Sequence, residues 1–373
     1  MRLTGARVFD PLKGFQDREV CLEGEVISSR PSGGQIHLPG CWIIPGLTDL
    51  HFHGCMGADL SDADAAGLRT MAGYELSRGV TQICPAGMTL PAEQLSAVCR
   101  TAAAHRASGA QGAELVGINL EGPFLSQAKK GAQNGAWLQL PDAGLLMRLK
   151  EESGGLVKLV SVAPELPGAL EFIRAVRGQV TVSLAHTAAD YDQALAAFQA
   201  GAGQVTHLFN AMNPFAHRDP GPVGAALDSD CRVELICDGV HIHPAVVRAV
   251  FRLFGPERVI LISDTMRAAG LSDGQYTLGG QDVTVRGSRA TLCDGTIAGS
   301  VTDLMACMLT AVSFGIPLWH AVTAAAVNPA KALGIYDRFG SLDEGKAANL
   351  AVLSPDLTLR AVIFRGKLAA GNL

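Results

Sequence analysis

Hydrophobic and polar positions alternate in two different ways along the chain. Residues 1–45 read as short strands separated by Gly and Pro, for example at 18–22, 25–28 and 35–38, without a helical period. From Ile44 onward, apolar runs of four to eight residues are each followed by a longer Ala-rich stretch of helical character. This second pattern is typical of a parallel sheet built from βα units.

The apolar runs follow one another at spacings of about 20 to 40 residues, which is enough for a strand, a helix and their loops. They lie at residues 47–53, 81–85, 115–120, 157–163, 180–185, 204–208, 233–237 and 259–263. Eight such units are what a closed (β/α)8 barrel requires. We therefore predict an α/β fold whose main part is a (β/α)8 TIM barrel.

Two segments follow the eighth run. Residues 275–291 turn strand-like again, with Gly279-Gly280 as a turn. Residues 304–330 contain no Asp, Glu, Lys or Arg and are long enough to span a bilayer, which needs ~20 apolar residues. Gly and Pro at 315–317 interrupt this stretch. We therefore expect two buried helices joined by a short loop, and no membrane span.

The C-terminal segment, residues 340–373, returns to short strands, at 349–353 and 361–364. Both ends of the chain thus resemble small β modules, and we expect them to pair into one β-sandwich. The predicted domains are residues 1–45 and 340–373 as the two parts of the sandwich, with the barrel at 46–339.

Composition and charge narrow the class of protein. The chain has 373 residues, 48% hydrophobic and 17% charged, which is too apolar for a disordered chain. With 30 basic and 35 acidic residues, the net charge of −5 offers no basic surface for nucleic acid or an anionic membrane. Nine cysteines without a C-x-x-C spacing favour neither a disulfide framework nor a zinc knuckle. The N-terminus lacks the apolar stretch of a signal peptide, so we expect a cytoplasmic protein.

Imidazole and carboxylate side chains recur where the predicted barrel strands end. They are His51, His53, Glu121, His186, His207 and Asp264. A single His at a strand end more often serves as hydrogen-bonded scaffolding, and a carboxylate there could cap the next helix. Neutral imidazole and carboxylate are nevertheless the usual ligands of Zn²⁺ and Fe²⁺, and six of them at one barrel mouth favour a divalent metal site.

These residues resemble the ligand pattern of the amidohydrolase superfamily of metal-dependent hydrolases. Longer motifs narrow the resemblance to the N-acetylglucosamine-6-phosphate deacetylase family. The motifs are EGPF at 121–124, KKGA at 129–132, THLFNAM at 206–212, DGVH at 238–241 and DGTIAGS at 294–300. The resemblance covers nearly the whole chain, and the run at 206–212, followed by RDPG at 218–221, is its most specific part.

The resemblance implies a divalent metal, Zn²⁺ or Fe²⁺, held by Glu121, His186 and His207. Members with His-x-His on the first strand can bind a second ion there, so His51 and His53 leave one or two ions per subunit open. Both metals suit this ligand set, and the ligand types alone do not choose between them.

The reaction implied by the resemblance is removal of the acetyl group from N-acetyl-D-glucosamine 6-phosphate, giving D-glucosamine 6-phosphate and acetate in amino-sugar catabolism. A metal would activate the attacking water and polarise the acetyl carbonyl. Asp264 would act as general base toward this water and then as general acid toward the departing C2 amine. The alternative is that Asp264 only ligates the metal.

Substrate-binding residues are also implied by the resemblance. The phosphate is assigned to Arg218 of the neighbouring subunit in a homodimer, to His241, and to main-chain groups of Asn210 and Ala211. Arg suits phosphate because its planar fork pairs with two oxygens; a surface ion pair between Arg218 and Asp219 is the alternative. The sugar pocket is assigned to Ala132, Gln133, Ile297, Ala298, Gly299 and Ser300.

Gln133 departs from the family, which usually has His at this position. Gln can donate and accept hydrogen bonds but carries no charge. N-acetylgalactosamine 6-phosphate therefore stays open as the substrate. A cyclic amidase or dipeptidase is a further alternative, which would not need Arg218 and His241; the lack of a Lys at the end of the fourth strand counts against the cyclic amidase. The last alternative is a non-catalytic sugar-phosphate-binding barrel, which the retained Asp264 disfavours.

Overall fold

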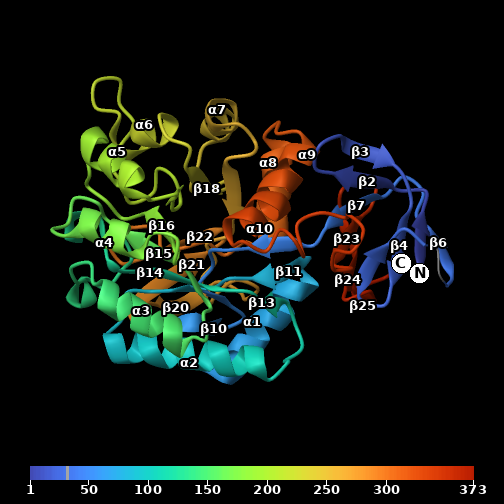
Figure 1. Cartoon of the computed structure of the whole chain (residues 1–373), viewed down its shortest axis with the longest axis horizontal. Helices are drawn as coiled ribbons and strands as arrows, with labels where there is room; N and C mark the ends of the chain where they lie inside the picture. The colour runs from blue at the N-terminus through green and yellow to red at the C-terminus, as the bar shows by residue number, and fades with distance from the viewer. Residues whose placement is uncertain (31–32) are drawn as a thin grey trace.

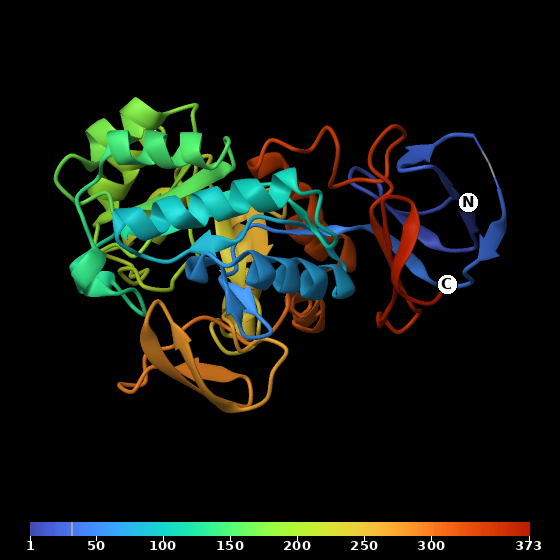
Figure 2. The ribbon, with the colours of Figure 1, turned by 90° about the horizontal axis from the view of Figure 1, so that it is seen from below.

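The fold is that of a computed structural model, which describes residues 1–30 and 33–373. A larger lobe of strands and helices carries most of the chain, and a smaller lobe of strands holds both termini (Figure 1). Seen after a 90° turn, the smaller lobe lies at one end of the molecule, and an antiparallel segment stands out from the side of the larger lobe (Figure 2). All the site residues expected from the sequence fall within the larger lobe.

Parallel strands form the centre of the larger lobe, as predicted. Along the described residues they are β8 (Leu47–Asp49), β11 (Val80–Ile83), β14 (Ile118–Phe124), β15 (Val157–Val162), β16 (Thr181–Leu184), β17 (Gln204–Val205), β18 (Arg232–Ile236) and β19 (Val259–Ile262). β14 to β19 pair in chain order in one sheet, β8 pairs with β11, and the short β12 (Ala86–Gly87) and β13 (Glu114–Leu115) extend the pairing between them.

The ring of strands closes where the eighth strand meets the first. The Asp264 N–H donates to the His51 carbonyl at 2.9 Å, and the His53 N–H donates to the Thr265 carbonyl at 2.7 Å. The prediction of a (β/α)8 barrel is confirmed. The end of the first strand differs from the prediction. β8 ends at Asp49, so His51 and His53 lie beyond the strand.

Helices cover the outside of the barrel and alternate with its strands. They are α1 (Ala65–Ser77), α2 (Ala92–Ala107), α3 (Ala143–Glu152), α4 (Ala169–Val176), α5 (Tyr191–Ala200), α6 (Gly221–Leu227) and α7 (Pro244–Phe254). Aspartates cap several N-termini, since their carboxylates accept the free N–H groups of the first turn; Asp64 caps α1, Asp142 caps α3 and Asp190 caps α5. Asp190 also forms a capping box with Gln193.

The strand-like segment after the eighth strand is an antiparallel sheet of β20 (Gly274–Leu278), β21 (Gln281–Arg286) and β22 (Arg289–Thr291). Its apolar side packs on residues of the barrel mouth, including Met88, Ala132 and Met266. This segment therefore forms a wall beside the ends of the barrel strands (Figure 2). Short strands β9 (Gly54–Cys55) and β10 (Ala58–Asp59) form a small hairpin after the first barrel strand.

The smaller lobe is built by both chain ends, as expected. One sheet has the order β25-β24-β23-β7-β2-β3 and the other has the order β5-β4-β1-β6. Their bounds are β1 (Arg2–Thr4), β2 (Arg7–Asp10), β3 (Gly14–Asp17), β4 (Val20–Glu23), β5 (Val26–Ser28), β6 (Gln35–His37), β7 (Trp42–Pro45), β23 (Leu350–Leu353), β24 (Leu359–Phe364) and β25 (Lys367–Gly371). β7 pairs with β23, and Leu3, Ile43 and Leu350 share one buried cluster.

The uncharged stretch at 304–330 forms buried helices, as predicted. α8 (Leu304–Ser313) is followed by a loop and then by α9 (Leu318–Val322), which runs through a π-helical turn (Thr323–Val327) into α10 (Asn328–Ala332). The Asn328 side-chain amide donates to the carbonyls of Pro256 and Val259, which ties this helix to the start of β19. Among the described residues, no helix is long and apolar enough to cross a membrane.

Candidate functional site

Three of the expected metal-ligating and catalytic residues have a positive φ, which residues other than glycine rarely adopt. His186, His207 and Asp264 have φ values of 45°, 30° and 50°. A positive φ is strained for residues with a Cβ and is tolerated where surrounding contacts hold it. Each lies two residues beyond the end of a barrel strand, so the strained backbone places its side chain at the barrel mouth.

Glu121, His186 and His207 bring their ligand atoms together. The Oε1 atom of Glu121 lies 3.1 Å from His186 Nε2 and 2.8 Å from His207 Nε2, and the two nitrogens are 3.2 Å apart. All three residues are buried. Within residues 1–30 and 33–373, this is one of two His and Glu groups whose ligand atoms all lie within 4.8 Å of one another.

The hydrogen bonding of the His186 ring fits a metal ligand. His186 Nδ1 lies 2.9 Å from the Lys129 carbonyl, and a carbonyl only accepts, so Nδ1 donates a proton. In the neutral ring, Nε2 then presents a lone pair to the centre of the cluster. A metal-ligating His typically donates its other N–H to an oxygen in this way.

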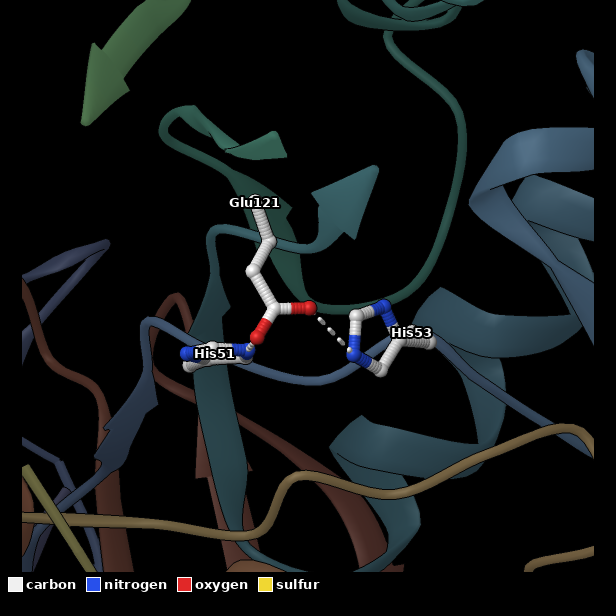
Figure 3. Close-up of side chains that lie close together, drawn as sticks. All are labelled: His51, His53 and Glu121. Carbon is white, nitrogen blue, oxygen red and sulfur yellow. Dashed lines mark ion pairs between the residues drawn. The ribbon is translucent and has the colours of Figure 1, made fainter. Parts of the chain in front are cut away.

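The second group consists of His51, His53 and Glu121. Figure 3 shows the two rings on either side of the Glu121 carboxylate. His53 Nε2 lies 3.3 Å from Glu121 Oε2 and 3.3 Å from Asp264 Oδ1. His51 Nδ1 lies 2.8 Å from Glu234 Oε2, while His51 Nε2 is buried, has no hydrogen bond within the described residues and faces Glu121 and Asp264, each at 3.6 Å. The imidazoles expected at the first strand are therefore placed at this cluster.

The surrounding charges decide the protonation of both site carboxylates. Burial alone would raise the pKa of Glu121, but the charge of His51 and the close approach of the His186 and His207 rings hold that pKa well below its usual value. Burial likewise opposes ionisation of Asp264, whereas its hydrogen bond with His53 lowers the pKa. Both carboxylates are accordingly ionised near neutral pH.

A pocket of about 390 Å³ opens over these groups. Of the residues expected from the sequence, its lining includes His53, Glu121, Ala132, Gln133, His186, His207, Asn210, Ala211, His241, Asp264, Ile297 and Gly299. This size is within the usual range for small-molecule sites. Residues from barrel loops and from the 294–300 segment thus meet in one cavity, with the candidate metal ligands at its floor.

His241 and the 209–212 turn form another part of the pocket wall. His241 Nδ1 lies 2.7 Å from Asp238 Oδ2; burial would lower the pKa of His241, but Asp238 raises it above the usual value. The Asn210 N–H donates to the His207 carbonyl at 2.9 Å, while no hydrogen bond of the Ala211 N–H is seen among the described residues. A cation and a backbone donor are therefore available for an anionic group.

Four expected residues lie outside the pocket lining. His51 is buried behind it, and Arg218 is exposed, with Nη1 2.6 Å from the His217 ring. Ser300 donates from Oγ to the Ser263 carbonyl at 2.6 Å, so it supports the end of β19. Ala298 packs in the apolar cluster beneath the β20 to β22 sheet.

Sequence reasoning missed several lining residues, namely Met88, Ala128, Lys129, Gly131, Leu278 and Thr296. Lys129 and Gly131 belong to the KKGA motif, which could have indicated them. Glu234 was also missed, although it bonds His51 and accepts from Gln204 Nε2 at 2.6 Å. Its signal was present, because a carboxylate within the apolar run at 233–237 needs a polar partner.

Comparisons with known proteins identify the family of the chain. A model of the Amidohydrolase family matches residues 42–369. The N-acetylglucosamine-6-phosphate deacetylase of Bacillus subtilis (strain 168) is 39% identical over 363 residues, covering 95% of this chain and 92% of the relative. The N-acetylgalactosamine-6-phosphate deacetylase of Escherichia coli O157:H7 is 35% identical over 331 residues, 88% of each chain.

A solved structure extends the similarity to the whole fold. It is a mutant N-acetyl-D-glucosamine-6-phosphate deacetylase from Mycobacterium smegmatis in complex with N-acetyl-D-glucosamine-6-phosphate. Its TM-score is 0.93 at 34% sequence identity, with 99% of both chains covered. Amidohydrolases generally depend on divalent metals, in agreement with the two ligand groups. The chain therefore belongs to the amidohydrolase family and, within it, to the N-acetylglucosamine-6-phosphate deacetylases.

Proposed function

We propose that the chain hydrolyses the N-acetyl group of N-acetyl-D-glucosamine 6-phosphate, releasing D-glucosamine 6-phosphate and acetate in amino-sugar catabolism. The observation that carries the proposal is that Asp264 lines one pocket together with the Glu121, His186 and His207 donor set. A proton carrier next to a metal-ligand set is what amide hydrolysis needs. Relatives named for this reaction, at 33% to 39% identity, support it.

Glu121, His186 and His207 would hold a Zn²⁺ or Fe²⁺ ion, and His51 with His53 would hold a second ion where one binds. When bound, the metal activates the attacking water and polarises the acetyl carbonyl. His186 and His53 direct Nδ1 to the Lys129 and Ala86 carbonyls, which leaves Nε2 of each ring facing the cluster. Burial of the cluster limits the access of other water.

Asp264 moves the proton. Its carboxylate starts ionised, so it takes a proton from the water that attacks the acetyl carbon. It then delivers this proton to the C2 nitrogen, since an amide nitrogen leaves poorly unless it is protonated. Backbone bonds to His51 and Ser300 hold Asp264 in its strained conformation over the strand ends.

The phosphate would be held by His241, by the Ala211 amide and by Arg218 of a second copy in a homodimer. Burial lowers the pKa of His241, but Asp238 faces the ring and raises that pKa above its usual value, which favours the cationic ring. Arg218 is exposed and lies outside its own chain's pocket lining, which supports a role toward a neighbouring copy. A negatively charged protein can bind a phosphate in this way without a basic surface.

N-acetylgalactosamine 6-phosphate is the second candidate substrate. It is favoured by the 35% identity to the E. coli relative named for it and by Gln133 at the position where the family usually has His. The two hexosamines differ only at C4, so one pocket could accept either.

Acetate release tests both candidates. The purified chain is loaded with Zn²⁺ or Fe²⁺, and acetate is measured with each hexosamine phosphate and with unphosphorylated N-acetylglucosamine. We expect release from the glucosamine derivative, with a lower kcat/KM for the galactosamine derivative and for the unphosphorylated sugar. No acetate from either phosphate with metal-loaded protein would refute the proposal.

A further inference from the structure

Gln133 lines the pocket next to the candidate metal ligands. Its side chain is 1% exposed. Its Oε1 accepts from the Thr89 backbone N–H at 2.8 Å. Since a backbone N–H only donates, the orientation of the amide is fixed, and its NH₂ group must face the other way.

The NH₂ group of Gln133 faces the shared metal ligand. Nε2 lies 2.6 Å from Oε2 of Glu121, while Oε1 of Glu121 faces His186 and His207. The two oxygens of the Glu121 carboxylate therefore contact different groups. A carboxylate rotates easily about its last torsion, and a hydrogen bond to one oxygen from a fixed donor restricts that rotation.

The charge of the donor matters for a cation site. An amide donates a hydrogen bond without carrying a charge, so Gln133 orients Glu121 without neutralising it or repelling a cation. On the other side of the cluster, His53 also approaches Oε2, at 3.3 Å. Oε2, the oxygen nearest His53, is thus already engaged by Gln133, whereas Oε1 faces only imidazole nitrogens.

We propose that Gln133 is a positioning residue for the metal centre. Its amide turns Oε1 of Glu121 toward His186 and His207, which makes these three residues the tight divalent-cation site. An ion at His51 and His53 is held more weakly, because Gln133 takes up part of the bonding capacity of Oε2. This inference deepens the proposed function and rests on its metal dependence.

The test measures zinc directly. Zn²⁺-loaded protein is transferred to a chromophoric chelator, and the rate and stoichiometry of release are recorded. Gln133→Leu removes the amide oxygen and the NH₂ group at similar side-chain volume. In this variant the tight Zn²⁺ should leave about 10- to 100-fold faster, as for other residues that orient a metal ligand. In the wild type, one equivalent should leave slowly, and any second equivalent should leave first.

Two variants serve as controls. Gln281→Leu makes the same chemical change in an amide that donates to the Ala132 carbonyl and, within the described residues, has no hydrogen bond to Glu121, so its release rate should equal the wild type. Gln133→His restores an N–H donor and should bring the rate back toward the wild type. Circular dichroism checks folding; if Gln133→Leu does not fold, Gln133→Ala replaces it, since water can then reach the Thr89 N–H.

The inference is overturned if the folded Gln133 variant releases Zn²⁺ at the wild-type rate, or if two wild-type equivalents leave together. Acetate release separates this from the proposed function. Faster zinc release in Gln133→Leu, with no acetate formed by the wild type, contradicts the proposed function alone. Acetate formation with unchanged zinc release contradicts the role of Gln133 alone.

Discussion

At the scale of single residues, Asp264 is held in place by its backbone and left ionised by its neighbours. Its N–H donates to the His51 carbonyl, its carbonyl accepts from Ser300, and its carboxylate faces His53. Asp264→Asn keeps this shape and removes the proton-accepting group. We expect kcat to fall about 10²- to 10⁴-fold with the zinc content unchanged, measured by acetate release and elemental analysis. Full activity, or loss of zinc in step with activity, would contradict proton transfer by Asp264.

Glu75 on α1 is a buried acid outside the pocket lining. Within the described residues, neither of its oxygens has a hydrogen-bond partner. Burial, followed by the charges of Asp49 and Asp303, raises its pKa well above the usual 4.5, although Arg78 opposes this. The folded state therefore holds a proton that the unfolded state releases, and stability falls as the pH rises from about 4.5 toward the raised pKa.

Glu75→Gln should remove that pH dependence. We expect the free energy of unfolding of the variant, relative to that of the wild type, to be about 1 to 3 kcal/mol higher at pH 8 than at pH 5. Denaturant unfolding at the two pH values measures this difference. The matched control is Glu93→Gln, in the exposed first turn of α2, which should shift both values equally. Equal stability differences at pH 5 and pH 8 for Glu75→Gln would show that Glu75 is ionised in the folded protein.

At the scale of elements, the turn between β18 and α7 favours the protonated form of His241. The Asp238 carboxylate accepts from the backbone N–H groups of Val240 and His241 and faces the His241 ring. The same pair holds the pKa of Asp238 below its usual value, against the effect of burial. Asp264 also raises the pKa of His241, by its charge. The turn thus keeps His241, in the pocket wall, protonated to a higher pH than an ordinary His.

Asp238→Asn should lower the pKa of the buried His241 ring. Because burial lowers the pKa of His241 and Asp238 raises it, the variant should lose the cation as the pH rises through about 6.5 or below. We expect KM for the phosphorylated sugar to increase roughly ten-fold more between pH 6 and pH 8 than in the wild type. KM for unphosphorylated N-acetylglucosamine is the control and should change equally in both proteins; an equal change for both sugars would refute the phosphate role of His241.

The order of strands and helices could be read from the sequence, whereas their ends could not. Apolar runs with helical stretches between them predicted the barrel, because strands that are buried on both faces of a sheet need continuous apolar residues. The first strand stops at Asp49, whose carboxylate accepts the His51 N–H and turns the chain. A local side-chain bond of this kind competes with strand pairing and leaves no period in the sequence.

At the scale of the whole molecule, the proposed dimer makes the phosphate site a property of two chains. Arg218→Ala should raise KM for the phosphorylated sugar on the order of 10- to 100-fold, as expected for a lost charged hydrogen bond, and change KM for the unphosphorylated sugar little. Mixing the variants decides which chain supplies the arginine. Hybrid dimers of Arg218→Ala and Asp264→Asn contain one intact site if Arg218 acts on the neighbouring pocket.

Such a mixture, after reversible dissociation, should recover about a quarter of the wild-type activity at low substrate, since half of the dimers are hybrids with one intact site in two. Each unmixed variant is the control. If Arg218 serves its own pocket, every site carries one defect and mixing restores nothing. A monomer in analytical ultracentrifugation at assay concentration would contradict the dimer itself.

The sequence by itself determined the barrel, the terminal sandwich and the types of chemistry, because these depend on periodicity and on residue identity. The grouping of Glu121 with His186 and His207, 65 and 86 residues away, follows from the ring of strands, which brings strand ends together regardless of sequence distance. Only the tertiary structure decided that Gln133 bonds Glu121, that Ser300 supports β19 and that Arg218 lies outside its own pocket. Loop side chains take their partners from elements packed against them, and no local pattern in a chain encodes those partners.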